Sequence, residues 1–118
     1  MYIISNKQGQ AIAKLSNNIL FDFEMNEVIG IVIGNCFFGS TGEIVGKIFN
    51  DTVYLTKGDI IGKLALDGQF KNKSLKKEHM VKAWSILSHI KDHTIPWIKE
   101  SKRWDNRSLT ECLEIRIS

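Results

Sequence analysis

The residues of this sequence that could bind a metal ion are few and lie mostly in its second half. His89 and His93 are four residues apart on a segment with helical spacing, where two imidazoles can share one metal ion. A zinc site needs at least a third protein ligand, and the candidates are Asp92, His79 and the distant Cys112. On a helical wheel both paired histidines lie at the polar border. We therefore interpret them as solvated surface side chains and expect no metal site.

Cations and indoles form a second constellation. Residues 69–118 contain eleven Lys and Arg residues against six acidic residues, whereas residues 1–68 contain five lysines against seven acids. The basic part also contains all three tryptophans, Trp84, Trp97 and Trp104. Cations for phosphates and indoles for base stacking are what single-stranded nucleic acid binding needs. The overall net charge of +3 is modest and no nucleic-acid motif is readable, so this function is the alternative and not the favoured one.

Indoles and guanidinium groups also dominate binding hot spots between proteins. We expect Trp84 to serve internal packing, because it lies in the middle of the apolar arc of a predicted helix. The candidate binding residues are therefore Trp97, Lys99, Lys102, Arg103 and Trp104. A structural alternative is that the last two tryptophans only close the C-terminal segment onto the rest of the protein.

Catalytic motifs are missing from the sequence. It contains no Gly-rich phosphate loop between a strand and a helix, no G-x-S-x-G segment and no paired carboxylates on a readable common face. Cys36 and Cys112 are too few and too dispersed for a disulfide scaffold or a zinc knuckle, so we interpret them as buried reduced thiols. We expect a non-catalytic binding protein without a cofactor, whose partner is a protein or a small ligand. An enzyme of unrecognised type is a third, less favoured reading.

The elements that must position these residues begin with an internal repeat. Between Tyr2 and Gly68 the chain contains four copies of a unit of about sixteen residues. Two positions align in all copies and are mostly glycine. The first is occupied by Gly9, Asn26, Gly42 and Gly58, and the second by Ala13, Gly30, Gly46 and Gly62. The spacing is seventeen residues once and then sixteen twice.

Each copy has the pattern of a β-hairpin, in which apolar segments alternate with turns. The turns between copies are the residue pairs 17–18, 34–35, 50–51 and 67–68, composed of Asn, Asp and Gly. These residue types tolerate the positive φ of two-residue hairpin turns. We therefore predict eight short antiparallel strands in up-and-down order.

The second strand of each copy indicates which face is buried. Alternate residues are apolar, tiny and apolar, in the sets 11-13-15, 28-30-32, 44-46-48 and 60-62-64, and the opposite face carries Lys14, Ile31, Lys47 and Lys63. Because side chains alternate along a strand, we predict that the glycine face forms the core and the lysine face meets solvent. Glycine inside a strand costs roughly 0.5–1 kcal/mol relative to alanine. We therefore expect backbones to approach closely there, or an aromatic ring to cover the gap.

The fourfold hairpin unit, with its aligned glycines and its I/V-I/V-G-K/I-I/V/L segment, resembles the four-fold beta flower domain of small bacterial proteins. The resemblance covers about residues 2–68. It implies four β-hairpins around a pseudo-fourfold axis and no catalytic residues, because the family is functionally uncharacterised. Ala13, Asn26 and Ile31 depart from the consensus of the repeat and all lie in its first two copies.

The composition changes after the repeats, so we divide the chain into a four-repeat β domain, residues 1–68, and a basic, Trp-containing helical extension, residues 69–118. Ser74 is a candidate N-cap, and apolar residues at helical spacing predict a long helix over residues 75–91. The second repeat is apolar on both faces around residues 28–33, and a strand of this kind is normally covered on both. We therefore predict that the long helix packs across the outside of the second repeat.

The rest of the extension predicts less regular elements. Pro96 is compatible with the first turn of a short helix ending at about residue 102. The tail 108–118 has both a capping-box spacing and a strand-like alternation, and we favour a short strand. The fold class expected is thus mainly β with a C-terminal α part of one long and one short helix. The N-terminus lacks the pattern of a signal peptide and no segment reaches the roughly 20 apolar residues of a membrane span, so we expect a cytoplasmic protein without a membrane partner.

Overall fold

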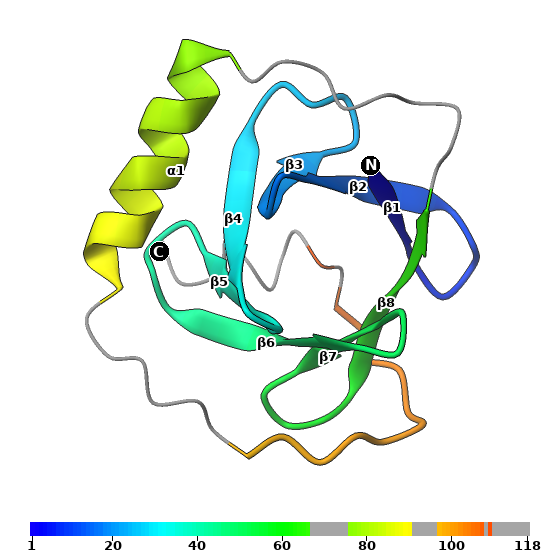
Figure 1. Ribbon diagram of the computed structural model, residues 1–118. Helices are drawn as coiled ribbons and strands as arrows, with labels where there is room; N and C mark the ends of the chain where they lie inside the picture. The colour runs from blue at the N-terminus through cyan, green and yellow to red at the C-terminus, as the bar shows by residue number, and fades with distance from the viewer. Residues whose placement is uncertain (67–75, 91–96, 108, 110–118) are drawn as a thin grey trace.

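The structure, a computed structural model, describes residues 1–66, 76–90, 97–107 and 109. Its strands are β1 (Tyr2–Ser5), β2 (Ala11–Ser16), β3 (Ile19–Asp22), β4 (Val28–Ile33), β5 (Cys36–Gly39), β6 (Ile44–Phe49), β7 (Thr52–Leu55) and β8 (Ile60–Leu66), and the helix α1 is Lys77–His89. Each strand pairs antiparallel with its sequence neighbours, and β8 pairs back with β1 to close a barrel (Figure 1). The predicted fold class, mainly β with four hairpins followed by a long helix, is confirmed.

The turns between hairpins have the backbone conformation that their sequence requires. In the turns 17–18 and 50–51 both residues have positive φ, between 50° and 63°. In the turn 34–35 only Gly34 has positive φ, at 62°. Both patterns twist in the sense that joins antiparallel strands tightly. The prediction is confirmed at these three turns, and the fourth, 67–68, lies outside the described residues.

The turn inside each hairpin closes with one repeated hydrogen bond, in which the backbone N–H of residues 9, 25, 42 and 58 donates to the carbonyl oxygen three residues earlier. The residue with positive φ is glycine in three copies and Met25, at 60°, in the second. The predicted alignment of Asn26 with the turn glycines was therefore wrong. Asp22 N–H bonds to Glu27 O, five residues ahead, where the equivalent bonds of the other copies span four. The extra residue follows Met25 and explains the single spacing of seventeen.

A β-bulge at the same place in every hairpin changes which side chains face the barrel interior. One residue of each second strand has no partner across the ladder, and these residues are Ile12, Ile29, Val45 and Ile61. All four pack in the interior cluster. A bulge places two residues opposite one and interrupts the alternation of side chains. Val28 and Ile44, predicted to face inward, precede the bulge and pack in the outer cluster instead.

Beyond the bulge the predicted alternation holds. The glycine position is buried in the second, third and fourth copies. A Cβ on Gly46 would collide with Tyr54 O and lie 2.8 Å from Phe37 Cε1, and Phe37 is the residue paired opposite Gly46. Close backbone approach and a covering aromatic ring therefore act together at this glycine. Leu109, from the C-terminal part, also joins the interior cluster.

The outside of the second repeat is covered by α1, as predicted (Figure 1). Ile86 and Ile90 of the helical segment are buried in one cluster with Phe21 of β3 and with Val28 and Ile31 of β4. The helix begins at Lys77 and ends at His89, slightly inside the predicted range, and the proposed N-cap lies outside the described residues. The apolar outer face of this repeat is thus buried by packing against the helix.

The outer lysine position is less exposed than predicted. Lys63 is exposed, but Lys14 is buried and its ammonium lies 4.8 Å from the ring centroid of Phe23. Lys47 is half-buried because its ammonium donates to the backbone oxygen of Ile98 in the C-terminal segment. The outer face of the barrel is therefore solvated in part and used for docking in part.

Candidate functional site

The predicted binding residues lie on an extended segment, residues 97–107, which we call the strap. It runs along the outside of the barrel to the start of β8 (Figure 1). The short helix predicted over residues 96–102 is wrong for its described part, since residues 97–102 contain no helix. In this part Ser101 N–H donates to Gly58 O of the fourth repeat, and Ile98 O accepts the ammonium of Lys47 of the third repeat.

Three backbone hydrogen bonds fix the strap to the fourth repeat, one at its turn and two at the first residue of β8. Ser101 N–H donates to Gly58 O at 3.0 Å, Ile60 N–H donates to Arg103 O at 2.7 Å, and Asp105 N–H donates to Ile60 O at 2.8 Å. Trp104, between the last two contact points, forms a parallel β-bridge with Ile60. The strap therefore adds a short extended segment to the edge of the barrel.

The first half of the strap is held by a lysine and a glycine of the barrel. Lys47 Nζ lies 2.9 Å from Ile98 O and 2.8 Å from Glu100 Oε1. The hydrogen bond from this ammonium lowers the pKa of the Glu100 carboxyl. A Cβ on Gly58 would collide with Lys99 O, so only glycine allows this approach.

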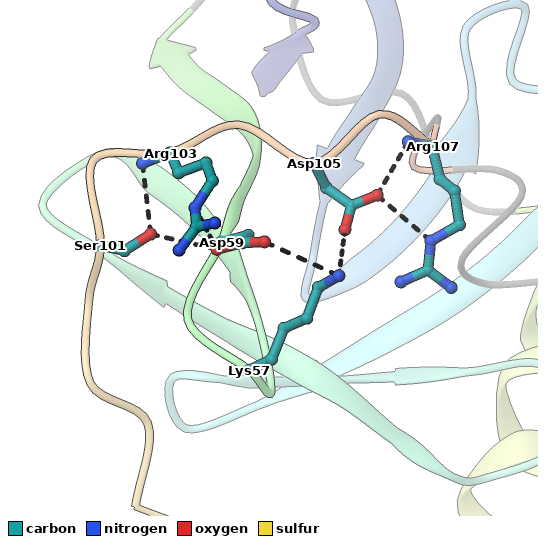
Figure 2. A network of polar contacts seen from close by, with 6 residues as sticks. All are labelled: Lys57, Asp59, Ser101, Arg103, Asp105 and Arg107. Atoms are coloured by element: carbon teal, nitrogen blue, oxygen red, sulfur yellow. Dashed lines mark hydrogen bonds and ion pairs between the residues drawn. The ribbon is translucent and has the colours of Figure 1, made fainter.

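An ion network holds the second half of the strap (Figure 2). Asp105, whose side chain is 4% exposed, accepts Lys57 Nζ at 2.7 Å and Arg107 Nε at 3.1 Å. Burial alone would raise the pKa of Asp105, but the hydrogen bonds from Lys57 and Arg107 outweigh it and hold that pKa far below its ordinary value. The bond to Asp105 raises the pKa of Lys57 in turn.

Asp59 extends the network along the barrel turn (Figure 2). Its carboxylate accepts a hydrogen bond from Ser101 Oγ at 3.2 Å and lies 3.6 Å from Lys57 Nζ and 3.8 Å from Arg103 Nε. The side chain of Arg103 is nevertheless 82% exposed. The network therefore fixes the backbone of the strap while leaving this guanidinium available to solvent.

The five predicted binding residues have unequal environments on this fixed backbone. Trp97 is 90% exposed. Lys99, Lys102 and Arg103 are exposed as well, whereas Trp104 is half-buried against the barrel. Closing the segment onto the barrel is thus a role for Trp104 and not for Trp97.

The helix also has an apolar surface that is exposed, and the prediction for its central residue was wrong. Trp84 was expected in the interior but is 67% exposed. Three further apolar side chains of the helix, Met80, Val81 and Leu87, are also exposed. The row that packs on the barrel contains His79, Ala83, Ile86 and Ile90. The apolar arc of the helix is wider than the stripe that the barrel covers, and only one edge of the arc is buried.

A cavity of about 390 Å³ lies between α1 and the second repeat, and sequence reasoning missed it. It is lined by Asn26, Glu27, Val28, Ile29, Ser40, Glu78, His79 and Lys82. The ring of His79 packs edge-on against Phe21 at 5.1 Å, and its Nε2 lies 3.3 Å from Asn26 O. The position of His79 one turn before Ala83 and two turns before Ile86 was the available signal for a buried histidine.

The described residues contain neither a cluster of metal ligands nor a membrane-spanning helix. No three His, Cys, Asp or Glu residues of this part lie close enough together to hold a metal ion. His89 Nδ1 lies 2.6 Å from Ser85 O, and His93 is outside the described residues. Cys36 is a buried free thiol, and burial raises its pKa. The described part of the chain has no helix of the length and hydrophobicity that crossing a membrane requires.

Comparisons of the chain with protein-family models, with curated proteins and with solved structures gave no match in any of the three. The barrel is compatible with the expected flower-like arrangement of hairpins. Function is therefore inferred from the surfaces that the chain itself presents.

Proposed function

We propose that this protein is a non-catalytic interaction protein, in which the barrel is a scaffold and the strap contacts a partner protein. The observation that carries the proposal is Trp97, which is 90% exposed on a backbone held by the barrel. An indole supplies a large contact area with few rotatable bonds. A contact residue on a backbone that is already ordered also loses less conformational entropy on binding.

The charges around Trp97 favour an acidic partner surface. Lys99 and Lys102 are exposed and form no ion pair with the described residues. Arg103 is exposed beside a carboxylate that also contacts Lys57 and Ser101. A partner that combines an apolar pocket with surrounding Asp or Glu residues would match both the indole and these cations.

Nucleic acid is the second candidate partner, because the same strap offers an indole for stacking beside three cations for phosphates. The two partners differ in their response to salt. With three phosphate contacts, binding to a single strand should weaken by roughly twentyfold between about 50 and 200 mM salt. A contact anchored by Trp97 in an apolar pocket weakens far less.

We further infer that the barrel belongs with the four-fold beta flower domains. Support comes from the four bulged hairpins, which close into a ring with equivalent turn bonds. In this proposal residues 1–68 supply the scaffold and residues 69–118 carry the contact.

The test uses the full-length protein as bait, with Trp97→Ala and the matched control Trp84→Ala, which removes an exposed indole from the helix. We expect at least about tenfold lower recovery of acidic partner proteins with Trp97→Ala alone, as for a hot-spot residue. The melting temperature should not change, since the side chain is exposed. Equal recovery with both variants, or recovery that nuclease treatment abolishes, would contradict a protein partner at Trp97.

A further inference from the structure

The fourth repeat shows how this barrel binds an extended segment. Ile60 is paired opposite Tyr54 and directly precedes the bulged residue Ile61. Its N–H donates to Arg103 O of the strap, and its C=O accepts the N–H of Asp105. The start of β8 therefore has backbone groups that point away from the barrel ladder and pair with another extended chain.

The second repeat has the same edge at Val28. This residue is paired opposite Phe21 and directly precedes the bulged residue Ile29. Equal register places its N–H and C=O on the same side of the hairpin as those of Ile60. Among the described residues, no backbone hydrogen bond from a turn, loop or other segment ends on Val28.

At Val28 the structure has a cavity where the fourth repeat has the strap. Val28 and its neighbours Glu27 and Ile29 form one wall of the 390 Å³ cavity. Residues of α1, among them Glu78 and Lys82, form another. The volume is within the range of roughly 300–1,000 Å³ that ligand sites have.

The polar groups at this cavity indicate the charge of its occupant. Asp59 precedes Ile60 and contacts Ser101 and Arg103 of the strap. Glu27 precedes Val28 in the same way and lines the cavity together with Glu78 and Lys82 of the helix, so that two carboxylates face one ammonium group. Ser40 also lines it, and its Oγ is buried without a hydrogen-bond partner in the described part of the chain.

We propose that this cavity binds a short extended peptide that carries a lysine or arginine side chain, by addition to the Val28 edge. One peptide carbonyl accepts the N–H of Val28, and the N–H two residues later donates to Val28 O. The cationic side chain lies between Glu27 and Glu78. This site lies on the second repeat and does not depend on Trp97 or on the strap.

The probe peptide is the sequence of residues 101–105, acetyl-Ser-Lys-Arg-Trp-Asp-amide, because this segment already fits the equivalent edge. It is titrated into full-length, ¹⁵N-labelled protein. We expect saturable shifts of the amides of Val28, Ile29 and Ser40. Replacing both cationic residues of the peptide by glutamine should weaken binding by about tenfold or more, as expected for charge-assisted hydrogen bonds.

Two matched controls separate backbone addition from general attraction. N-methylation of the final residue of the peptide removes the donor equivalent to Asp105 N–H and should weaken binding by about fivefold or more. The protein variant Glu27→Gln with Glu78→Gln should weaken binding by about tenfold. The control Glu24→Gln, in the same turn but not lining the cavity, should have no effect.

Three outcomes would overturn the proposal. They are the lack of saturable binding up to roughly millimolar peptide, shifts confined to Ile60 and the strap, and equal affinity for the methylated and unmethylated peptides. Shifts confined to Ile60 would mean that the peptide only displaces the strap. None of these outcomes bears on the proposed contact at Trp97, so the two proposals can fail separately.

Discussion

The second and fourth repeats have the same backbone but are covered by the C-terminal part of the chain in different ways. The second repeat has an apolar outer face and is covered by α1 through side-chain packing. The fourth repeat carries Lys57, Asp59 and Lys63 on its outside and is met by the strap through backbone bonds and ion pairs. The side chains added to a common frame thus decide whether a helix or an extended segment docks there.

The helix and the strap are therefore held to the barrel by different interactions. Packing of α1 buries apolar side chains, among them Ile86 and Ile90, and their burial involves no charge that salt could screen. The strap depends on the charge of Asp105 and on hydrogen bonds, which exchange with water bonds and contribute less each. We therefore expect that detaching the helix from the barrel requires more free energy than detaching the strap.

The largest loss of stability is expected for a substitution in the barrel core, which all repeats share. Gly46→Val should destabilise the protein by about 3 kcal/mol or more, because its side chain would collide with Tyr54 O and Phe37. Lys63→Val, on the exposed outer face, should cost less than about 1 kcal/mol. Urea unfolding measures both, and similar losses would show that the inner and outer faces are assigned wrongly.

A smaller effect is expected where the helix covers the second repeat. Ile86 is 1% exposed, so Ile86→Ala should cost about 2–4 kcal/mol through the lost contacts and the cavity left behind. The neighbouring Leu87→Ala, at 43% exposure, should cost less than about 1 kcal/mol. Thermal unfolding of the two variants decides the orientation of the helix. A larger loss for Leu87→Ala would mean that the opposite row packs on the barrel.

The smallest effect is expected at the strap of the fourth repeat. Asp105→Asn should cost about 1–2 kcal/mol at pH 7, because Lys57 and Arg107 lose a charged partner. The folded state depresses the pKa of Asp105, so its contribution is complete above the unfolded value of about 3.9 and is lost as the pH falls toward the folded value.

The difference in unfolding free energy between the parent and Asp105→Asn should therefore be constant from about pH 7 to 5 and shrink below about pH 4. Urea unfolding over this pH range measures it. Asp51→Asn is the control, since Asp51 is exposed in a turn and has no ion pair with the described residues. A difference that persists unchanged to pH 2 would contradict the role of the Asp105 charge.

Most of the barrel and the docking of its helix could be predicted from the sequence, but little of the candidate sites could. The eight strands and the docking of the helix on the second repeat follow from local turn chemistry and from an unusual strand with two apolar faces. The exposure of Trp84 and the burial of His79 could not be predicted. Apolar residues occupy a broad arc of the helix, and a wheel does not show which edge of the arc meets the barrel.

The sequence by itself determined the fourfold repeat, its turns and the segment that forms a helix, because these depend on the conformational preferences of neighbouring residues. Only the tertiary structure decided that a bulge places Ile29 inside and Val28 outside. It also decided that the strap is extended, because Ile60 offers backbone groups to a segment more than forty residues away. Local patterns specify which hydrogen bonds and apolar faces need partners, but the closed barrel determines which partners lie within reach.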